Sequence, residues 1–76
     1  MKTEEFRLDR DYIELCALLK LVGAVNTGGE AKAIIAGGQV KVDSVLETRK
    51  RCKIRVGQEV QYESLKILIK KAEEND

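Results

Sequence analysis

The amino-acid sequence predicts a small α+β domain in which two helices pack on a small antiparallel sheet. Residues 11–23 and 27–38 carry apolar side chains at helical spacing, and short segments after residue 38 alternate apolar with polar residues. The 76 residues suffice for one small hydrophobic core, and no linker or internal repeat interrupts them. We therefore expect residues 1–76 to form a single domain.

The first strand and the first helix are predicted before residue 24. Phe6 and Leu8 alternate with charged residues, which indicates a short strand. Asp11 and Glu14 have the spacing of a capping box. Apolar residues then follow at helical spacing, namely Leu15, Leu18, Leu19 and Val22. Gly23 stands where a left-handed residue commonly ends a helix, so we expect a helix of about three turns.

The second helix is predicted to begin after Thr27. Thr27 and Glu30 form a second capping-box pair. An apolar face follows, made of Ala31, Ile34 and Ile35. The glycine pair Gly37-Gly38 then ends the helix.

A hairpin is predicted after this helix. Val40 and Val42 point inward and Lys41 outward if this segment is extended. Asp43 and Ser44 then make a tight turn.

The rest of the chain is predicted to form short extended pieces on both sides of Gly57. Residues 65–70 satisfy strand and helix spacing alike, and we favour a strand because Ile-Leu-Ile is short and rich in β-formers. The tail, residues 73–76, is expected to be loose.

The residue types argue against an enzyme and against a metal site. The chain has no histidine, the commonest general base and transition-metal ligand. Cys16 and Cys52 lack the paired spacing of a zinc site, and we interpret them as free, buried thiols. Gly23 and Gly28 have the spacing of phosphate-loop glycines, but the next two residues are Gly and Glu instead of Lys and Ser or Thr. We predict no catalytic residue, no cofactor and no metal.

The sequence contains no apolar run of about eighteen residues that could span a bilayer, and no apolar signal region follows Met1. We therefore expect a cytoplasmic protein without a membrane partner.

The formal net charge of +1 conceals a basic middle between acidic ends. Residues 33–56 contain six basic and two acidic side chains. A local excess of cations attracts polyanions such as nucleic acid. If residues 49–55 are extended, four cations project to one side about 6.6 to 6.8 Å apart, namely Arg49, Arg51, Lys53 and Arg55. Such a row can follow phosphates, and the alternative is an edge strand whose charges prevent aggregation.

The start of the second helix is another candidate for anion binding. The amides of residues 28–30 lie at the positive end of the helix dipole, and Lys32 follows them. A plain capped helix is the alternative. Lys41 adds one outward charge, whose ordinary role is solubility.

The three aromatic rings are predicted to belong to the core. Phe6, Tyr12 and Tyr62 all fall in apolar patterns. Stacking of unpaired bases on exposed rings is therefore disfavoured, and recognition of RNA shape and backbone is the expected mode.

These features follow one another in a specific order: two helices, Gly-x-Val-x-Val, a turn, Glu-x-Arg, Lys-Ile and Gly-x-x-Val. They lie in the segment LLKLVGAVNTGGEAKAIIAGGQVKVDSVLETRKRCKIRVGQEVQY. Over about residues 12 to 62 the chain resembles the RNA-binding domain named after the fourth protein of the small ribosomal subunit, also called the alpha-L RNA-binding motif. The resemblance implies two helices against a small sheet, with structured RNA, ribosomal or transfer RNA, bound by the second helix and the hairpin.

The resemblance also names the residues expected to contact RNA. Matched positions are Thr27, Lys32, Lys41, Arg49 and Lys53, and the patch is extended by Lys50 and Arg51. Gly28 departs from the family, because many members have a basic residue there, and Asp43-Ser44 replaces the usual Asn-Gly turn.

The stretches ETRKRCKI and GQVKVD are similar to the short stand-alone bacterial members. We therefore expect a non-catalytic monomer whose partners are RNA and a ribosomal or RNA-processing assembly. Its cations should converge on one exposed strip beside the amino end of the second helix. The alternative is a protein-interaction module whose basic segment docks an acidic partner.

Overall fold

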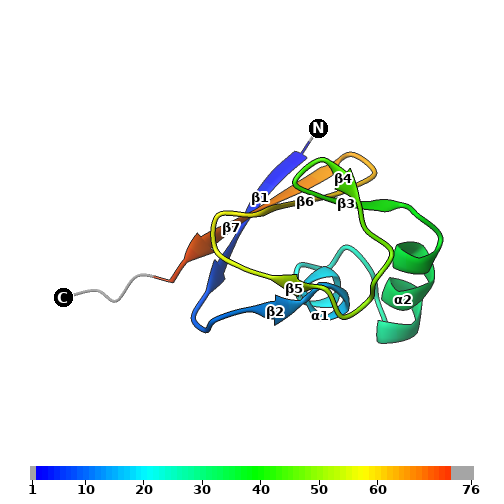
Figure 1. The fold of residues 1–76 in the computed structure, drawn as a ribbon, viewed down its shortest axis with the longest axis horizontal. Coiled ribbons are helices and arrows are strands. Elements are labelled where there is room, and N and C mark those ends of the chain that lie inside the picture. Colours follow the sequence, from blue (N-terminus) through cyan, green and yellow to red (C-terminus); the bar gives the residue numbers. More distant parts are fainter. Residues whose placement is uncertain (1, 73–76) are drawn as a thin grey trace.

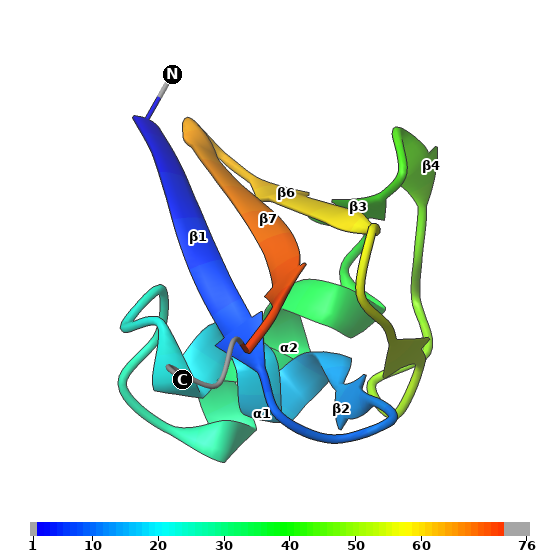
Figure 2. The ribbon, with the colours of Figure 1, turned by 90° about the vertical axis from the view of Figure 1, so that its left-hand side faces the viewer.

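The computed structural model describes residues 2–72 as two helices, a five-stranded sheet and a two-stranded ribbon (Figure 1). The elements in chain order are β1 (Lys2–Leu8), β2 (Ile13–Glu14), α1 (Leu15–Leu21), α2 (Gly28–Ala36), β3 (Val40–Val42), β4 (Val45–Leu46), β5 (Lys53–Ile54), β6 (Glu59–Tyr62) and β7 (Leu65–Lys71). Figure 2 shows both helices on one side of the sheet, with β2 beside α1. The predicted α+β class is confirmed.

The five-stranded sheet is mixed, with the strand order β1-β7-β6-β3-β4. The pairs β3–β4, β3–β6 and β6–β7 are antiparallel, as predicted. β1 runs parallel to β7, with Lys2 opposite Leu65 and Leu8 opposite Lys71, so the expectation of a wholly antiparallel sheet is wrong. A parallel pair needs a long crossover, which the chain makes by passing through both helices between these strands. Alternation of apolar residues is the same for both strand directions and could not distinguish them.

The ambiguity at residues 65–70 is resolved in favour of a strand, because β7 spans Leu65–Lys71. β1 also begins earlier than the alternation of Phe6 and Leu8 indicated, at Lys2. The tail expected to be loose, residues 73–76, lies outside the described residues.

The first helix is shorter than predicted and begins differently. α1 has seven residues, and Ile13–Glu14, which were expected to lie in its first turn, form β2, which pairs with β5. The predicted capping box of Asp11 and Glu14 is therefore wrong, and Glu14 makes no side-chain capping bond. Gly23 does adopt a left-handed conformation after the helix, with φ +78°, as predicted.

The second helix and its cap were predicted closely. Thr27 Oγ1 accepts a hydrogen bond of 3.1 Å from the Glu30 amide. The Glu30 carboxylate in turn accepts a bond of 2.8 Å from the amide of Asn26, one residue earlier than in a standard capping box. Gly38, after the helix, has φ +76°.

The hairpin of β3 and β4 has the predicted two-residue turn. Asp43 and Ser44 both have positive φ, 52° and 67°, as a type I′ turn requires. The Asp43 carboxylate accepts bonds from the Glu59 amide at 2.9 Å and from Gln58 Nε2 at 3.3 Å. The turn is thereby tied to the start of β6.

The hydrophobic core lies between the helices and the sheet. Its fully buried members are Leu15, Leu18, Leu19, Ala31, Ile35, Val40, Ile54, Val60 and Ile67. Cys16 and Cys52 are free thiols that are half-buried and pack against this core. Within residues 2–72, no helix combines the length and the hydropathy needed to cross a membrane.

Candidate nucleic-acid interface

The basic segment is a loop instead of the strand that the sequence suggested. We call residues 49–53 the basic loop. The chain turns at Lys50-Arg51, where the Cys52 amide donates a 3.1 Å hydrogen bond to the Arg49 carbonyl, and only Lys53–Ile54 is extended. The predicted row of four cations on one side of a long strand is therefore wrong. Two interpretations depended on that strand, namely a row of cations that follows phosphates and an edge strand whose charges prevent aggregation. Neither applies to a loop.

The first turn of α1 determines the shape of the basic loop. The amides of Leu15 and Cys16 donate hydrogen bonds to the carbonyls of Cys52 and Lys50, at 2.9 and 3.1 Å. These amides at the start of a helix have no partner within the helix. The loop carbonyls thus replace the side-chain cap that Glu14 does not provide.

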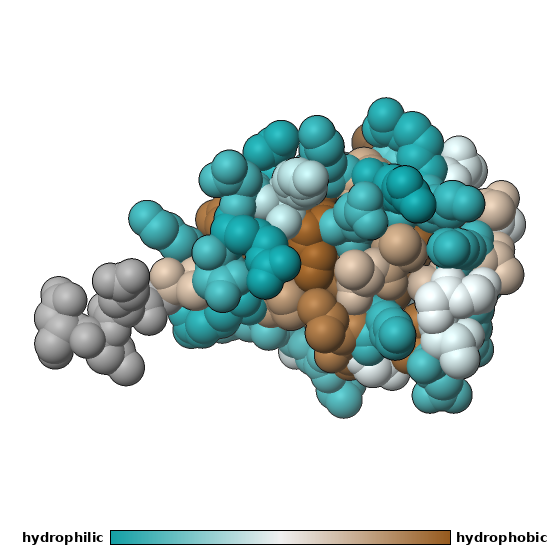
Figure 3. Space-filling view, turned by 90° about the horizontal axis from the view of Figure 1, so that it is seen from below, coloured by the Kyte–Doolittle hydropathy of each residue, from teal (hydrophilic) through white to brown (hydrophobic). Residues whose placement is uncertain are grey.

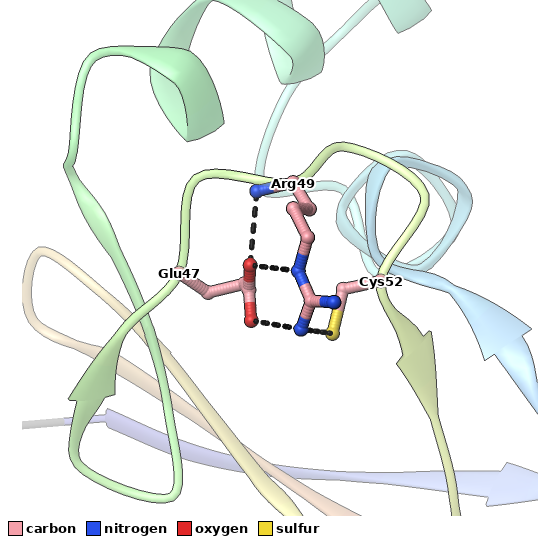
Figure 4. Close-up of polar contacts among 3 residues, drawn as sticks. All are labelled: Glu47, Arg49 and Cys52. Carbon is pink, nitrogen blue, oxygen red and sulfur yellow. Dashed lines mark hydrogen bonds and ion pairs between the residues drawn. The ribbon is translucent and has the colours of Figure 1, made fainter.

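A carboxylate-guanidinium pair braces the start of the loop (Figure 4). Arg49 Nε and Nη2 donate to the two Glu47 carboxylate oxygens at 2.9 and 3.2 Å, and the Arg49 amide donates to the same group at 3.0 Å. Arg49 Nη2 also lies 4.0 Å from Cys52 Sγ. The bonds from Arg49 lower the pKa of Glu47 from 4.5 to about 2, and that of Arg49 is raised. Partial burial, first among several causes, raises the pKa of the Cys52 thiol.

This pair changes the expected role of Arg49. Its charge is compensated by Glu47, whose side chain is only 15% exposed, although the Arg49 side chain itself is 77% exposed. Arg49 therefore stabilises the loop, and a contact of Arg49 with RNA stays a prediction.

The remaining cations of the basic loop are exposed and unpaired. Lys50, Arg51 and Lys53 form no ion pair with any carboxylate of residues 2–72. Arg51 and Lys53 line one shallow hollow together with Arg49 and Cys52. The loop thus presents a cluster of positive charge around a single depression.

Lys32 and Thr27 belong to α2. Lys32 is exposed and likewise has no carboxylate partner in the described part of the chain. Thr27 is exposed, but its hydroxyl oxygen is engaged in the helix cap. In Figure 1 the chain from β4 to β5 passes beside α2.

Lys41 is not brought together with the basic loop. Its neighbours Val40 and Val42 are buried against the helices, so alternation turns Lys41 to the opposite face of the sheet. On that face it lies across from Gln61 and Leu46. The single strip that the sequence suggested therefore does not include Lys41.

Tyr12 was predicted to be a core residue, and this prediction is wrong. The residue is 36% exposed, and Lys53 Nζ and Arg55 Cζ lie 4.9 and 5.7 Å from the ring centroid. Phe6 and Tyr62 do pack against the core, as predicted. The solvent exposure of Tyr12 could have been predicted from its alternation with the apolar Ile13. That prediction requires residues 13–14 to be assigned to a strand instead of a helix.

The S4 domain family matches residues 6–70 of this chain. The chain belongs to the S4 domain family. This confirms the resemblance inferred from the order of motifs along the sequence.

Two relatives of this S4 domain are the YbcJ proteins of Escherichia coli (strain K12) and Shigella flexneri. Each is 59% identical over 51 residues, which are 67% of this chain and 73% of the relative. The solution structure of Escherichia coli YbcJ matches with a TM-score of 0.59 and 47% identity, and covers 90% of this chain and 87% of YbcJ. That structure is described as revealing an αL motif involved in RNA binding.

In the described part of this S4 domain, no three Cys, Asp or Glu side chains gather where they could hold a metal ion. The unpaired cations around the basic loop are its distinctive chemical feature.

Proposed function

We propose that this S4 domain is a non-catalytic RNA-binding protein whose main contact surface is the basic loop, with Lys32 on α2 as a further contact. The observation that carries the proposal is the set of unpaired cations, Lys50, Arg51 and Lys53, on a loop held by the amides of α1. The αL motif described for YbcJ supports the same function.

Phosphate contacts supply most of the affinity in this proposal. A cation without a carboxylate partner is available to a phosphate oxygen, and its binding releases counterions from the RNA. The first-turn amides of α2 and the positive end of its dipole support a phosphate near Lys32. Thr27 keeps this turn in place through its bond to the Glu30 amide.

We infer that the RNA is structured, of the ribosomal or transfer class. The backbone of the basic loop is held by α1 at Lys50 and Cys52, so its cations have defined positions. Such an arrangement suits an RNA whose phosphates are also held in place by folding, because little flexibility is lost on binding. We further propose that the protein acts as a monomer in the cytoplasm, with a ribosomal or RNA-processing assembly.

The salt dependence of binding to a folded RNA hairpin tests this proposal. The logarithm of the affinity should fall linearly with the logarithm of salt concentration, with a slope of roughly −0.7 to −0.9 for each phosphate contacted. An affinity that does not change with salt would contradict it. Capture of partners from cell extract with and without ribonuclease tests the alternative of an acidic protein partner, since only RNA-mediated partners are lost on nuclease treatment.

A further inference from the structure

The ring of Tyr12 belongs to the outward face of the β2–β5 ribbon. Ile13 lies opposite Ile54 and Glu14 opposite Lys53, and the same register places Tyr12 across from Arg55. Ile13 and Ile54 are buried, so alternation turns Tyr12, Lys53 and Arg55 to solvent on the other side. The two cations then lie close enough to the ring for cation–π attraction, which orders an exposed side chain.

A second hollow lies beside Tyr12, and neither Lys53 nor Arg55 lines it. It is lined by Arg10, Asp11, Tyr12, Ile13, Glu14 and Ala17. No residue of β5 lines this hollow. Arg55 is tied to its lining, because Arg55 Nη1 donates a 3.5 Å hydrogen bond to the Asp11 carbonyl. Figure 3 views the molecule from below and shows a small apolar area enclosed by hydrophilic side chains.

The lining of this hollow selects the chemistry of its occupant. Asp11 and Glu14 repel a phosphate group, and Ala17 offers apolar contact. Arg10, the cation of this lining, is paired with Asp9 at 3.3 Å. A flat, uncharged ring suits such a site, because it stacks on Tyr12 while its amino or imino hydrogens are donated to the carboxylates. Lys53 and Arg55 then bind the phosphates on either side of the stacked base.

Lys53 joins this hollow to the proposed RNA surface. Its ammonium group contacts Tyr12, and its side chain also lines the depression shared with Arg49 and Arg51. An RNA strand that is bound along the basic loop can therefore continue to Tyr12 while its phosphates stay close to positive charge.

We propose that Tyr12 is a stacking site for one unpaired base of the bound RNA, with the adjacent phosphates held by Lys53 and Arg55. This inference rests on the proposed function and specifies the RNA feature recognised. The partner is then a structured RNA that carries a bulged or looped-out nucleotide next to a helix.

The experiment compares two RNA hairpins that differ by a single bulged 2-aminopurine. The protein should bind the bulged hairpin about tenfold more tightly than the fully paired one, and the 2-aminopurine fluorescence should be quenched on binding. Tyr12→Ala should abolish both the preference and the quenching, whereas Tyr12→Phe should retain both.

Leu21→Ala is the matched control. Leu21 is also exposed, at 66%, and it is the last residue of α1, whereas Tyr12 lies before the start of this helix. It should change neither the preference nor the quenching, and thermal unfolding of each variant shows that the fold is retained. If the protein binds both hairpins and Tyr12→Ala weakens both equally or neither, the stacking site is overturned while RNA binding stands. If the wild-type protein binds neither hairpin at any salt concentration, the proposed function fails as well.

Discussion

The amide of Cys16, in the first turn of α1, donates a 3.1 Å hydrogen bond to the carbonyl of Lys50 in the basic loop. This bond joins a helix packed in the core to the most basic segment of the chain. The neighbouring Leu15 is fully buried and makes the parallel bond to Cys52. The positions of the loop cations therefore depend on the core packing of α1.

Arg51 should contribute one phosphate contact to RNA binding. Arg51→Gln should weaken binding to all RNAs alike and make the slope of log affinity against log salt shallower by about 1. Lys70→Gln is the matched control, because Lys70 is an exposed cation on β7, away from the basic loop. Equal effects of the two substitutions, measured by fluorescence anisotropy, would contradict a localised surface.

Lys41 should matter less for RNA binding than Lys50. The two residues carry the same charge, but Lys41 lies on the sheet face opposite the helices and Lys50 lies on the loop held by α1. Lys50→Gln should therefore lower the affinity for a folded RNA several-fold more than Lys41→Gln at the same salt concentration. A larger loss from Lys41→Gln would place the RNA on the outer face of the sheet.

Glu47 should stabilise the fold in a pH-dependent way. Because its pKa is lowered from 4.5 to about 2 in the folded protein, its pairing with Arg49 stabilises the fold above pH 4.5, and this stabilisation is lost as the pH falls toward 2. Glu47→Gln should lower the free energy of unfolding by up to about 1 kcal/mol at neutral pH. The difference from wild type should shrink on acidification, as measured by urea denaturation.

Glu5→Gln serves as the control for this measurement. Glu5 pairs with Arg7 at 3.6 Å, and both side chains are about half exposed, at 51% and 56%. Little effect on stability is expected at any pH. If Glu47→Gln behaves in the same way as Glu5→Gln, the brace adds nothing to stability.

Thr27 should stabilise α2 through its cap. Thr27→Ala removes the acceptor of the Glu30 amide and should lower the free energy of unfolding by about 1 kcal/mol, whereas Thr27→Ser should retain it. Urea denaturation of the three proteins measures the difference. An unchanged stability of Thr27→Ala would show that water satisfies the amide equally well.

The features predicted correctly from the sequence depend on short-range chemistry. The cap of Thr27, the positive φ of Gly23 and the turn at Asp43-Ser44 involve residues within a few positions of one another. Backbone sterics and local hydrogen bonds decide them, so they are readable from neighbouring residues. The order of these motifs also sufficed to recognise the family.

The features that sequence patterns missed depend on partners far along the chain. Residues 13–14 form a strand because β5 lies beside them, and this pairing shortens α1 and turns Tyr12 to solvent. The basic loop bends because amides of α1 bind its carbonyls. β1 pairs in parallel with β7 across a long connection that contains both helices, as a parallel pair requires.

The features of the candidate site likewise separate into those that the sequence predicts and those that the tertiary structure decides. Which residues carry positive charge is written in the sequence, and most of the proposed contacts were named from it. Which of those charges are unpaired, which share a face and which ring lies beside them follow from long-range packing. Local patterns do not contain that information, because burial and hydrogen-bond partners come from residues about forty positions away, as Tyr12 and Arg55 show.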